Sequence, residues 1–201
     1  MNPYPTPPIV TTLGEAAYWI FVILLLLVGV FCVIMTLRSP RRIFVYLAAA
    51  ALAVALLTVA IPGPNAPLAV AVVLGVLVLA LATLGGGPAT QLVLAIASRG
   101  TVPEGRFGGI LVADHATTAP AGSTREILRG GTTIGVLERI ALAGSILAGF
   151  PQAIAVIVAI KSVGRLSELN ESEARERFII GTLVSLGWAS ACAGVWYFAT
   201  R

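Results

Sequence analysis

Two adjacent charges, Glu138 and Arg139, interrupt a long apolar stretch of the chain. A charge at the centre of a bilayer costs about 2.5–3.5 kcal/mol on insertion scales, so such a side chain normally faces protein or water and has a partner. A tight turn at Pro151 would form an antiparallel hairpin and bring Lys161 and Arg165 level with Glu138. Lys161 and Arg165 are four residues apart, so they share one helix face. We therefore predict an ion pair between Glu138 and either Lys161 or Arg165.

This intramembrane charge cluster (Glu138, Arg139, Lys161 and Arg165) admits two interpretations. It could be a buried staple that fixes the register of the hairpin, and this interpretation is favoured. It could also be a site for a proton, an ion or a lipid headgroup. Both interpretations predict that replacing the carboxylate changes folding or activity.

A second candidate is the dipeptide Asp114-His115, which lies in the longest polar segment of the chain. A neighbouring carboxylate and imidazole can bind a metal or move a proton. His115 is the only histidine, and no cysteine lies near it, so ordinary loop polarity is favoured and no metal site is predicted. The chain also lacks a phosphate-binding loop, a zincin motif, a nucleophile elbow and a CxxC pair, and no cofactor is expected.

The run Gly85-Gly86-Gly87-Pro88 predicts a helix break at 85–88. Glycines often end a helix, and proline fits the first turn of the next one, so a shorter helix is expected to restart at Pro88 and reach about Ser98. Discontinuous membrane helices can bind substrates or ions through exposed backbone groups. A simpler interpretation, which is favoured, places 88–98 along the membrane surface, because 68–84 is nearly long enough to cross a bilayer alone.

The composition indicates the class of protein that must position these groups. Of the 201 residues, 58% are hydrophobic and only 11% are charged, whereas soluble domains carry about 25% charged residues. Several stretches approach the roughly 20 apolar residues that cross a bilayer. Backbone polar groups in lipid must be paired internally, and continuous Ala/Leu/Val runs without alternation favour helices over a barrel. The two cysteines, Cys32 and Cys192, lie inside apolar runs and predict neither a disulfide nor a metal site.

The predicted fold is all-α: an integral membrane bundle of six transmembrane helices. An N-terminal tail covers 1–15, the first three helices with their break cover 16–98, a Gly/Thr/Pro-rich loop covers 99–130, and the charged hairpin and last helix cover 131–201. The six expected spans are 16–37, 43–61, 68–84, 132–150, 153–160 (continuing to 165) and 178–198.

The basic residues predict the orientation of this bundle. Eleven of the thirteen Lys and Arg residues lie in three segments on one predicted side: 38–42, 99–130 and 161–177. Because cytoplasmic loops carry an excess of Lys and Arg, these segments are expected in the cytoplasm and both termini outside, in a multi-pass protein of a bacterial cytoplasmic membrane. No aromatic residues interleave a basic stripe, so nucleic acid is not an expected partner.

The C-terminal 75 residues or so carry the pattern GxxIGxLER, KxxxR and ERFIIGTLxS. The residues that form it are Gly131, Ile134, Gly135, Leu137, Glu138, Arg139, Lys161, Arg165, Glu176, Arg177, Phe178, Gly181, Thr182 and Ser185. This order resembles a family of uncharacterised bacterial membrane proteins that is common in actinobacteria. The resemblance implies that the charged hairpin belongs to a shared design, and it implies no activity.

Two functional classes stay open on the sequence. The favoured one is a non-enzymatic membrane component, either an accessory subunit of a larger membrane complex or a small transporter, with membrane lipids as neighbours and a homo-oligomer as a further option. The alternative is a membrane enzyme that acts on a lipid or a lipid-linked substrate, with Glu138, Asp114 or His115 as acid or base. A water-filled cavity that reaches Glu138 would favour a transporter, and a flat apolar face larger than lipid contact needs would favour an accessory subunit.

Overall fold

A computed structural model describes residues 8–97, 110–113, 124–127, 131–166 and 172–201. Within them the chain forms six α-helices: α1 (Pro8–Arg38), α2 (Arg42–Ala60), α3 (Leu68–Ala97), α4 (Gly131–Leu147), α5 (Ala153–Leu166) and α6 (Ser172–Ala199). Between α3 and α4, β1 (Ile110–Ala113) pairs antiparallel with β2 (Thr124–Ile127), in the register that sets Ile110 opposite Ile127. This small sheet lies within the segment that the sequence predicts to be a loop.

Four of these helices are long and apolar enough to cross a membrane. The qualifying segments are Thr12–Arg38, Arg42–Ala60, Leu68–Ala97 and Arg175–Ala199. The other two helices have 17 residues in α4 and 14 in α5, which at 1.5 Å per residue gives lengths of about 26 and 21 Å. The predicted helical membrane class therefore agrees with the architecture, with four long helices and one shorter helical hairpin.

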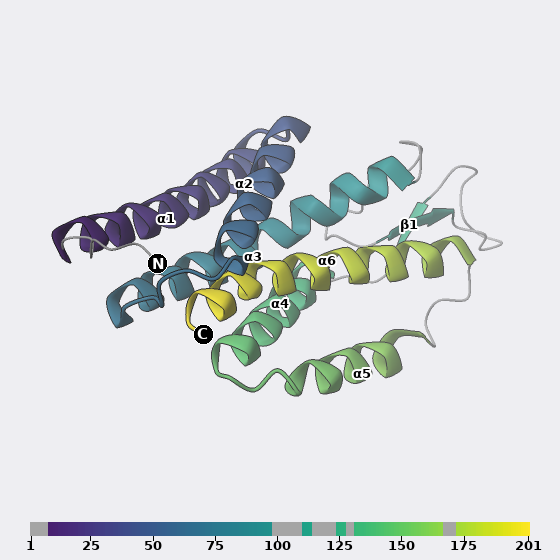
Figure 1. The fold of residues 1–201 in the computed structure, drawn as a ribbon. Coiled ribbons are helices and arrows are strands. Elements are labelled where there is room, and N and C mark those ends of the chain that lie inside the picture. The colour runs from purple at the N-terminus through teal and green to yellow at the C-terminus, as the bar shows by residue number, and fades with distance from the viewer. Residues whose placement is uncertain (1–7, 98–109, 114–123, 128–130, 167–171) are drawn as a thin grey trace.

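The core of the bundle is an antiparallel pair, α3 and α6 (Figure 1). Helices α1 and α2 pack against one side of this pair, α4 packs against both of its members, and α5 lies on α4 (Figure 1). Buried aliphatic side chains of α1, α3 and α4, such as Leu26, Leu81 and Leu142, meet small residues of α6 in the centre. The small residues on α6 let the helix backbones approach closely, as is typical of helix packing in lipid.

Tryptophan side chains of α6 fix its register against α3. The indole Nε1 of Trp188 donates to the Leu81 carbonyl at 3.0 Å, and that of Trp196 donates to the Ala71 carbonyl at 2.9 Å. Each ring lies where α3 has a glycine, since a Cβ on Gly85 would come within 2.7 Å of Trp188 and one on Gly75 within 3.4 Å of Trp196. Glycine thus removes the side chain that would otherwise block access to the helix backbone.

The predicted helix break at 85–88 is wrong. Helix α3 runs without interruption from Leu68 to Ala97, with Pro88 inside it. The glycines accommodate side chains of neighbouring helices: Trp188 lies against Gly85, and Arg139 lies against Gly86. Glycine and proline are tolerated inside membrane helices when neighbouring helices pack against them. The segment 88–98 is therefore neither part of a discontinuous span nor, over its described residues, a separate surface helix.

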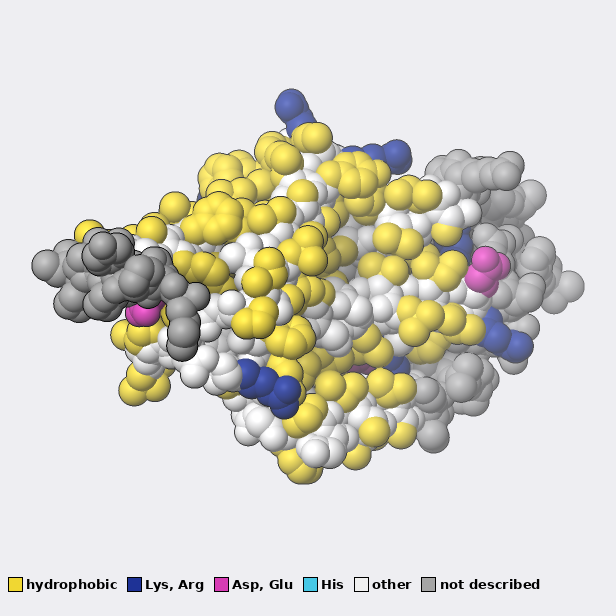
Figure 2. Space-filling model, viewed as in Figure 1, with side chains coloured by type: hydrophobic (Ala, Val, Ile, Leu, Met, Phe, Trp, Pro, Cys, Tyr) yellow, Lys and Arg dark blue, Asp and Glu magenta, His cyan; other side chains and the backbone are white. Residues whose placement is uncertain are grey.

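The outside of the helices is more apolar than a water-exposed surface would be. Large hydrophobic side chains point outward along α1, α2 and α3, including Phe31, Leu57 and Leu68, which are 59%, 67% and 82% exposed. Figure 2 shows apolar side chains over much of one face, with charged side chains at few places. Contiguous apolar surface of this extent is expected where a protein contacts lipid or another protein.

Candidate functional site

The helical hairpin α4–α5 carries the predicted ion pair. Lys161 of α5 donates a hydrogen bond to Oε2 of Glu138 on α4, and the two side chains are only 13% and 11% exposed. The Lys161 ammonium also lies 5.7 Å from the ring centroid of Phe178 on α6, within the range of a cation–π interaction. The structure therefore contains the first of the two pairs that the sequence allowed. Arg165 belongs to α5, but its side chain lies outside the described residues.

A tight turn sets α5 against α4. Gly149 has a φ of 73°, a left-handed conformation that side chains with a Cβ rarely adopt. The Gly149 amide donates to the Ile146 carbonyl at 3.0 Å, and the Phe150 amide donates to the Ser145 carbonyl at 2.8 Å. These two bonds form a Schellman motif, which ends a helix and redirects the chain. Pro151 then follows, so the turn lies where the sequence predicted the hairpin.

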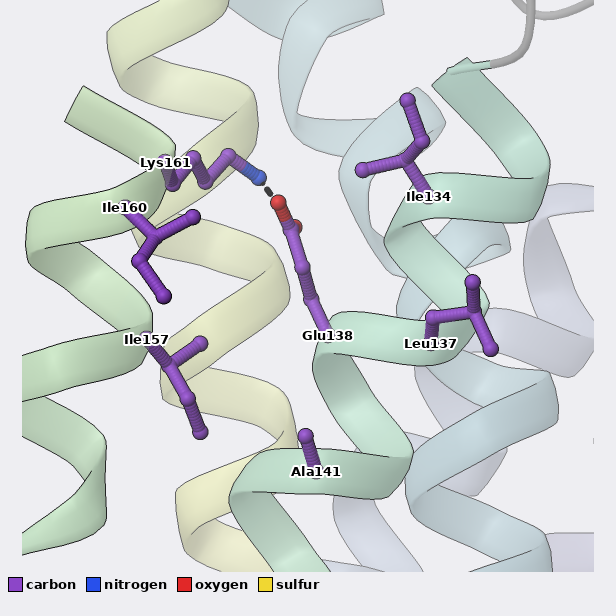
Figure 3. Close-up of a pocket in the computed structure, with 7 residues that line it drawn as sticks. All are labelled: Ile134, Leu137, Glu138, Ala141, Ile157, Ile160 and Lys161. Atoms are coloured by element: carbon purple, nitrogen blue, oxygen red, sulfur yellow. Dashed lines mark hydrogen bonds and ion pairs between the residues drawn. The ribbon is translucent and has the colours of Figure 1, made fainter. Parts of the chain in front are cut away.

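An open cavity of about 370 Å³ separates the two helices, and we call it the α4–α5 groove. On each helix the lining residues are spaced three and four apart, so they share one face. Figure 3 shows Glu138 and Lys161 meeting across the groove, with apolar side chains around them. The complete lining is Ile134, Leu137, Glu138, Ala141, Ile157, Ile160 and Lys161. The groove thus combines apolar walls with one carboxylate and one ammonium group.

Arg139 belongs to a different site. Successive residues of a helix point about 100° apart, so Arg139 turns away from Glu138 and enters the core between α3, α4 and α6, where it is 5% exposed. Its Nε donates to the Thr83 carbonyl at 3.0 Å, and its Nη1 donates to Ser185 Oγ at 3.1 Å. The predicted cluster is therefore divided between a groove site and a core site.

Glycines make the space for this buried guanidinium. A Cβ on Gly86 would lie 2.3 Å from Arg139 Cδ, and one on Gly135 would lie 3.0 Å from Nη1. Thr83 and Ser185 lie near the midpoints of α3 and α6, so the guanidinium is held halfway along the two long helices. Sequence reasoning missed this role, although Gly135 stands one helical turn before Arg139 and was a usable signal.

The other sequence candidates are the dipeptide Asp114-His115 and the two cysteines. Asp114 and His115 lie outside the described residues, so the enzyme interpretation that depends on them stays a prediction. Within the part of the chain that the structure describes, no group of three or more His, Cys, Asp or Glu residues could hold a metal. Cys32 and Cys192 are buried free thiols.

Comparison with known proteins yields no relative for this chain. No protein-family model, no curated protein and no solved structure matches it significantly. The resemblance of the C-terminal pattern to an actinobacterial membrane protein family therefore stays a prediction, and the function must be argued from the groove itself.

Proposed function

We propose that this chain is a non-enzymatic protein of a bacterial cytoplasmic membrane that binds an amphiphilic ligand from the lipid phase in the α4–α5 groove. In this role it is a small transporter or the ligand-binding subunit of a larger membrane complex. The observation that carries the proposal is the open cavity that reaches Glu138. Its volume of about 370 Å³ lies near the lower end of the range of small-molecule pockets, about 300–1,000 Å³.

The polarity of the groove supports a ligand with both an apolar and a polar part. Five of its seven lining residues are aliphatic, and the other two are the paired Glu138 and Lys161. Ligand pockets commonly have this composition, with apolar walls and a few polar groups that orient the ligand. Ionisable groups inside membrane proteins are expensive and are more often found at functional sites than on lipid-facing surfaces.

We propose that all six helices cross the membrane and that both termini lie outside. Helix α4 is short, but Leu147 at its end packs close to Gly75 of α3. A Cβ at Gly75 would lie 3.6 Å from Leu147 Cδ2, and Trp196 of α6 packs at the same place. Gly75 lies two turns from the start of α3, and Trp196 lies one turn from the end of α6. From Arg139, near the midpoint of the α3–α6 pair, helix α4 therefore reaches close to the end of the pair that holds Gly75 and Trp196. This reach supports a hairpin that crosses the membrane, with the basic segments in the cytoplasm.

A role as a subunit has support from α5. This helix has α4 as its main packing partner, and its side chains Val156 and Ile160 are 59% and 69% exposed. A helix that packs mainly on one neighbour leaves an apolar surface that lipid or a partner subunit can cover. The groove proposal holds in either setting, because the lining residues belong to this chain alone.

Photo-crosslinking tests the proposed function directly. The wild-type protein in phosphatidylcholine nanodiscs is expected to react with a twelve-carbon alcohol that carries a mid-chain diazirine, and the labelled peptides should come from α4 and α5. Ala141→Trp fills the groove with an indole, so it should lower this labelling to the level of the lipid-facing helices. Val72→Trp is the matched control, because Val72 is 58% exposed on α3 and does not line the groove. Equal labelling of all helices, or no effect of Ala141→Trp, would contradict the proposal.

A further inference from the structure

We propose that the α4–α5 groove selects an alkyl carboxylic acid, with Lys161 pairing with the ligand's carboxylate while Glu138 holds the ligand's proton. The inference rests on the proposed function, since it names the class of amphiphile that the groove takes. Its starting point is the Glu138–Lys161 ion pair, which lies in the wall of an apolar cavity.

Charge balance in the groove decides between ligand classes. Among the side chains that the structure describes, the lining of the groove holds one carboxylate and one ammonium, a net charge of zero. An acid that enters as an anion would bring this small apolar space to a net charge of −1, and uncompensated charge is costly at membrane depth. An acid that enters in its neutral form brings no charge. Neutral acids also partition into the lipid phase more readily than their anions, so they are available at an opening that faces lipid.

Proton transfer then lets the ligand's carboxylate replace that of Glu138 as the partner of Lys161. The O–H bond of the ligand acid breaks, and an O–H bond forms on Glu138. The ligand carboxylate accepts the hydrogen bond from Lys161, and nothing is oxidised or reduced. The exchange replaces one carboxylate beside Lys161 by another, and the burial of the alkyl chain favours the complex.

The groups around Glu138 agree with this exchange. From α5 it is faced by Lys161, whose ammonium also lies over the uncharged ring of Phe178 on α6. The next residue of α4, Arg139, directs its guanidinium to Thr83 and Ser185 between α3 and α6. No second carboxylate lies within 4 Å of Lys161 among the residues that the structure describes.

The shape of the groove favours a single alkyl chain over a two-chain lipid. Below the ion pair, the side chains of Ala141 and Ile157 offer apolar contact on opposite walls, as Figure 3 shows. The cavity of about 370 Å³ is small among ligand pockets. A carboxyl group beside Lys161 would leave its alkyl chain to run between these walls toward the hairpin turn.

The test compares two photoreactive probes with the same twelve-carbon chain, one an acid and one an alcohol, on the full chain in phosphatidylcholine nanodiscs. In the wild type at neutral pH the acid is expected to label α4 and α5 about tenfold more strongly than the alcohol, a ratio equivalent to about 1.4 kcal/mol. Lys161→Met should abolish this preference while labelling by the alcohol remains. If Lys161→Met does not fold, Glu138→Gln/Lys161→Met removes both charges and should give the same loss of preference.

The pH dependence of acid binding distinguishes the proposed proton exchange from a purely structural role of Glu138. Above the pH at which the free acid ionises, binding of the acid to the wild type must take up a proton. The logarithm of the association constant of the acid should therefore fall by about one per pH unit. Glu138→Gln leaves Lys161 without its carboxylate and accepts no proton. It should therefore bind the acid more tightly than the wild type, with no slope over the same range.

Three results would overturn the inference. Equal labelling by acid and alcohol in every variant would mean that the groove takes neutral chains, and the proposed function would survive. Displacement of the acid by excess phosphatidylglycerol, with the same dependence on Lys161, would make an anionic phospholipid the occupant. Absence of groove labelling by either probe would remove the proposed function itself.

Discussion

Gly86→Ala is expected to lower the free energy of unfolding by about 1–3 kcal/mol, the usual cost of overpacking a filled core. The new Cβ would lie 2.3 Å from Arg139 Cδ, and this side chain is held by Thr83 and Ser185 in a buried position. Gly85→Ala should cost a similar amount, because its Cβ would lie 2.7 Å from the rigid ring of Trp188. The measurement is reversible unfolding in mixed micelles with increasing dodecyl sulfate.

The third glycine of the same run provides the control. A Cβ on Gly87 would have nothing within 4 Å, and alanine is the better helix former by about 1 kcal/mol. Gly87→Ala should therefore leave the stability unchanged or raise it. A similar loss in all three variants would mean that the run responds to backbone flexibility, and the account of close packing against Trp188 and Arg139 would fail.

Removing one partner of the groove ion pair is expected to have the other large effect on stability. Glu138→Leu leaves the Lys161 ammonium without its carboxylate, and Lys161→Leu leaves the Glu138 carboxylate without its cation. Breaking a buried pair costs about 3–5 kcal/mol. Both side chains retain slight exposure here, so we expect a loss of about 2–3 kcal/mol from either change.

The double variant Glu138→Leu/Lys161→Leu should recover most of this loss, to within about 1 kcal/mol of the wild type, because well-packed apolar residues replace a buried ion pair at little cost. Glu15→Leu, on the exposed surface of α1, is the control and should change stability by less than about 0.5 kcal/mol. If the double variant loses the sum of the two single effects, the two charges are not coupled, and the hairpin is held by other contacts.

Much of the fold could be predicted because it follows from local patterns. Apolar runs and basic links place the long helices, with α2 at Arg42–Ala60 against a predicted span of 43–61. The ion pair could be predicted as well, because a turn at Pro151 and the spacing of Lys161 from it determine which residues come level with Glu138. The number of membrane crossings and the side on which the termini lie stay predictions.

The role of the glycine run could not be predicted, because it depends on residues more than fifty positions away. In isolation, Gly85-Gly86-Gly87-Pro88 favours a helix end, and only the positions of Arg139 and Trp188 show why a continuous helix needs glycine there. The same limit applies to Arg139 itself. Its direction follows from which face α4 presents to α3 and α6, and hydropathy alone does not specify that face.

The α4–α5 hairpin must cross the membrane if its groove is to take a ligand from the lipid phase. In a Cys32→Ala/Cys192→Ala background, Gln152→Cys places one thiol at the turn between α4 and α5. We predict that a membrane-impermeant maleimide added to intact cells labels this thiol, as it labels Asn65→Cys between α2 and α3, whereas Ser39→Cys between α1 and α2 reacts only after the membrane is opened. Labelling of Gln152→Cys only after the membrane is opened, together with Ser39→Cys, would contradict the account.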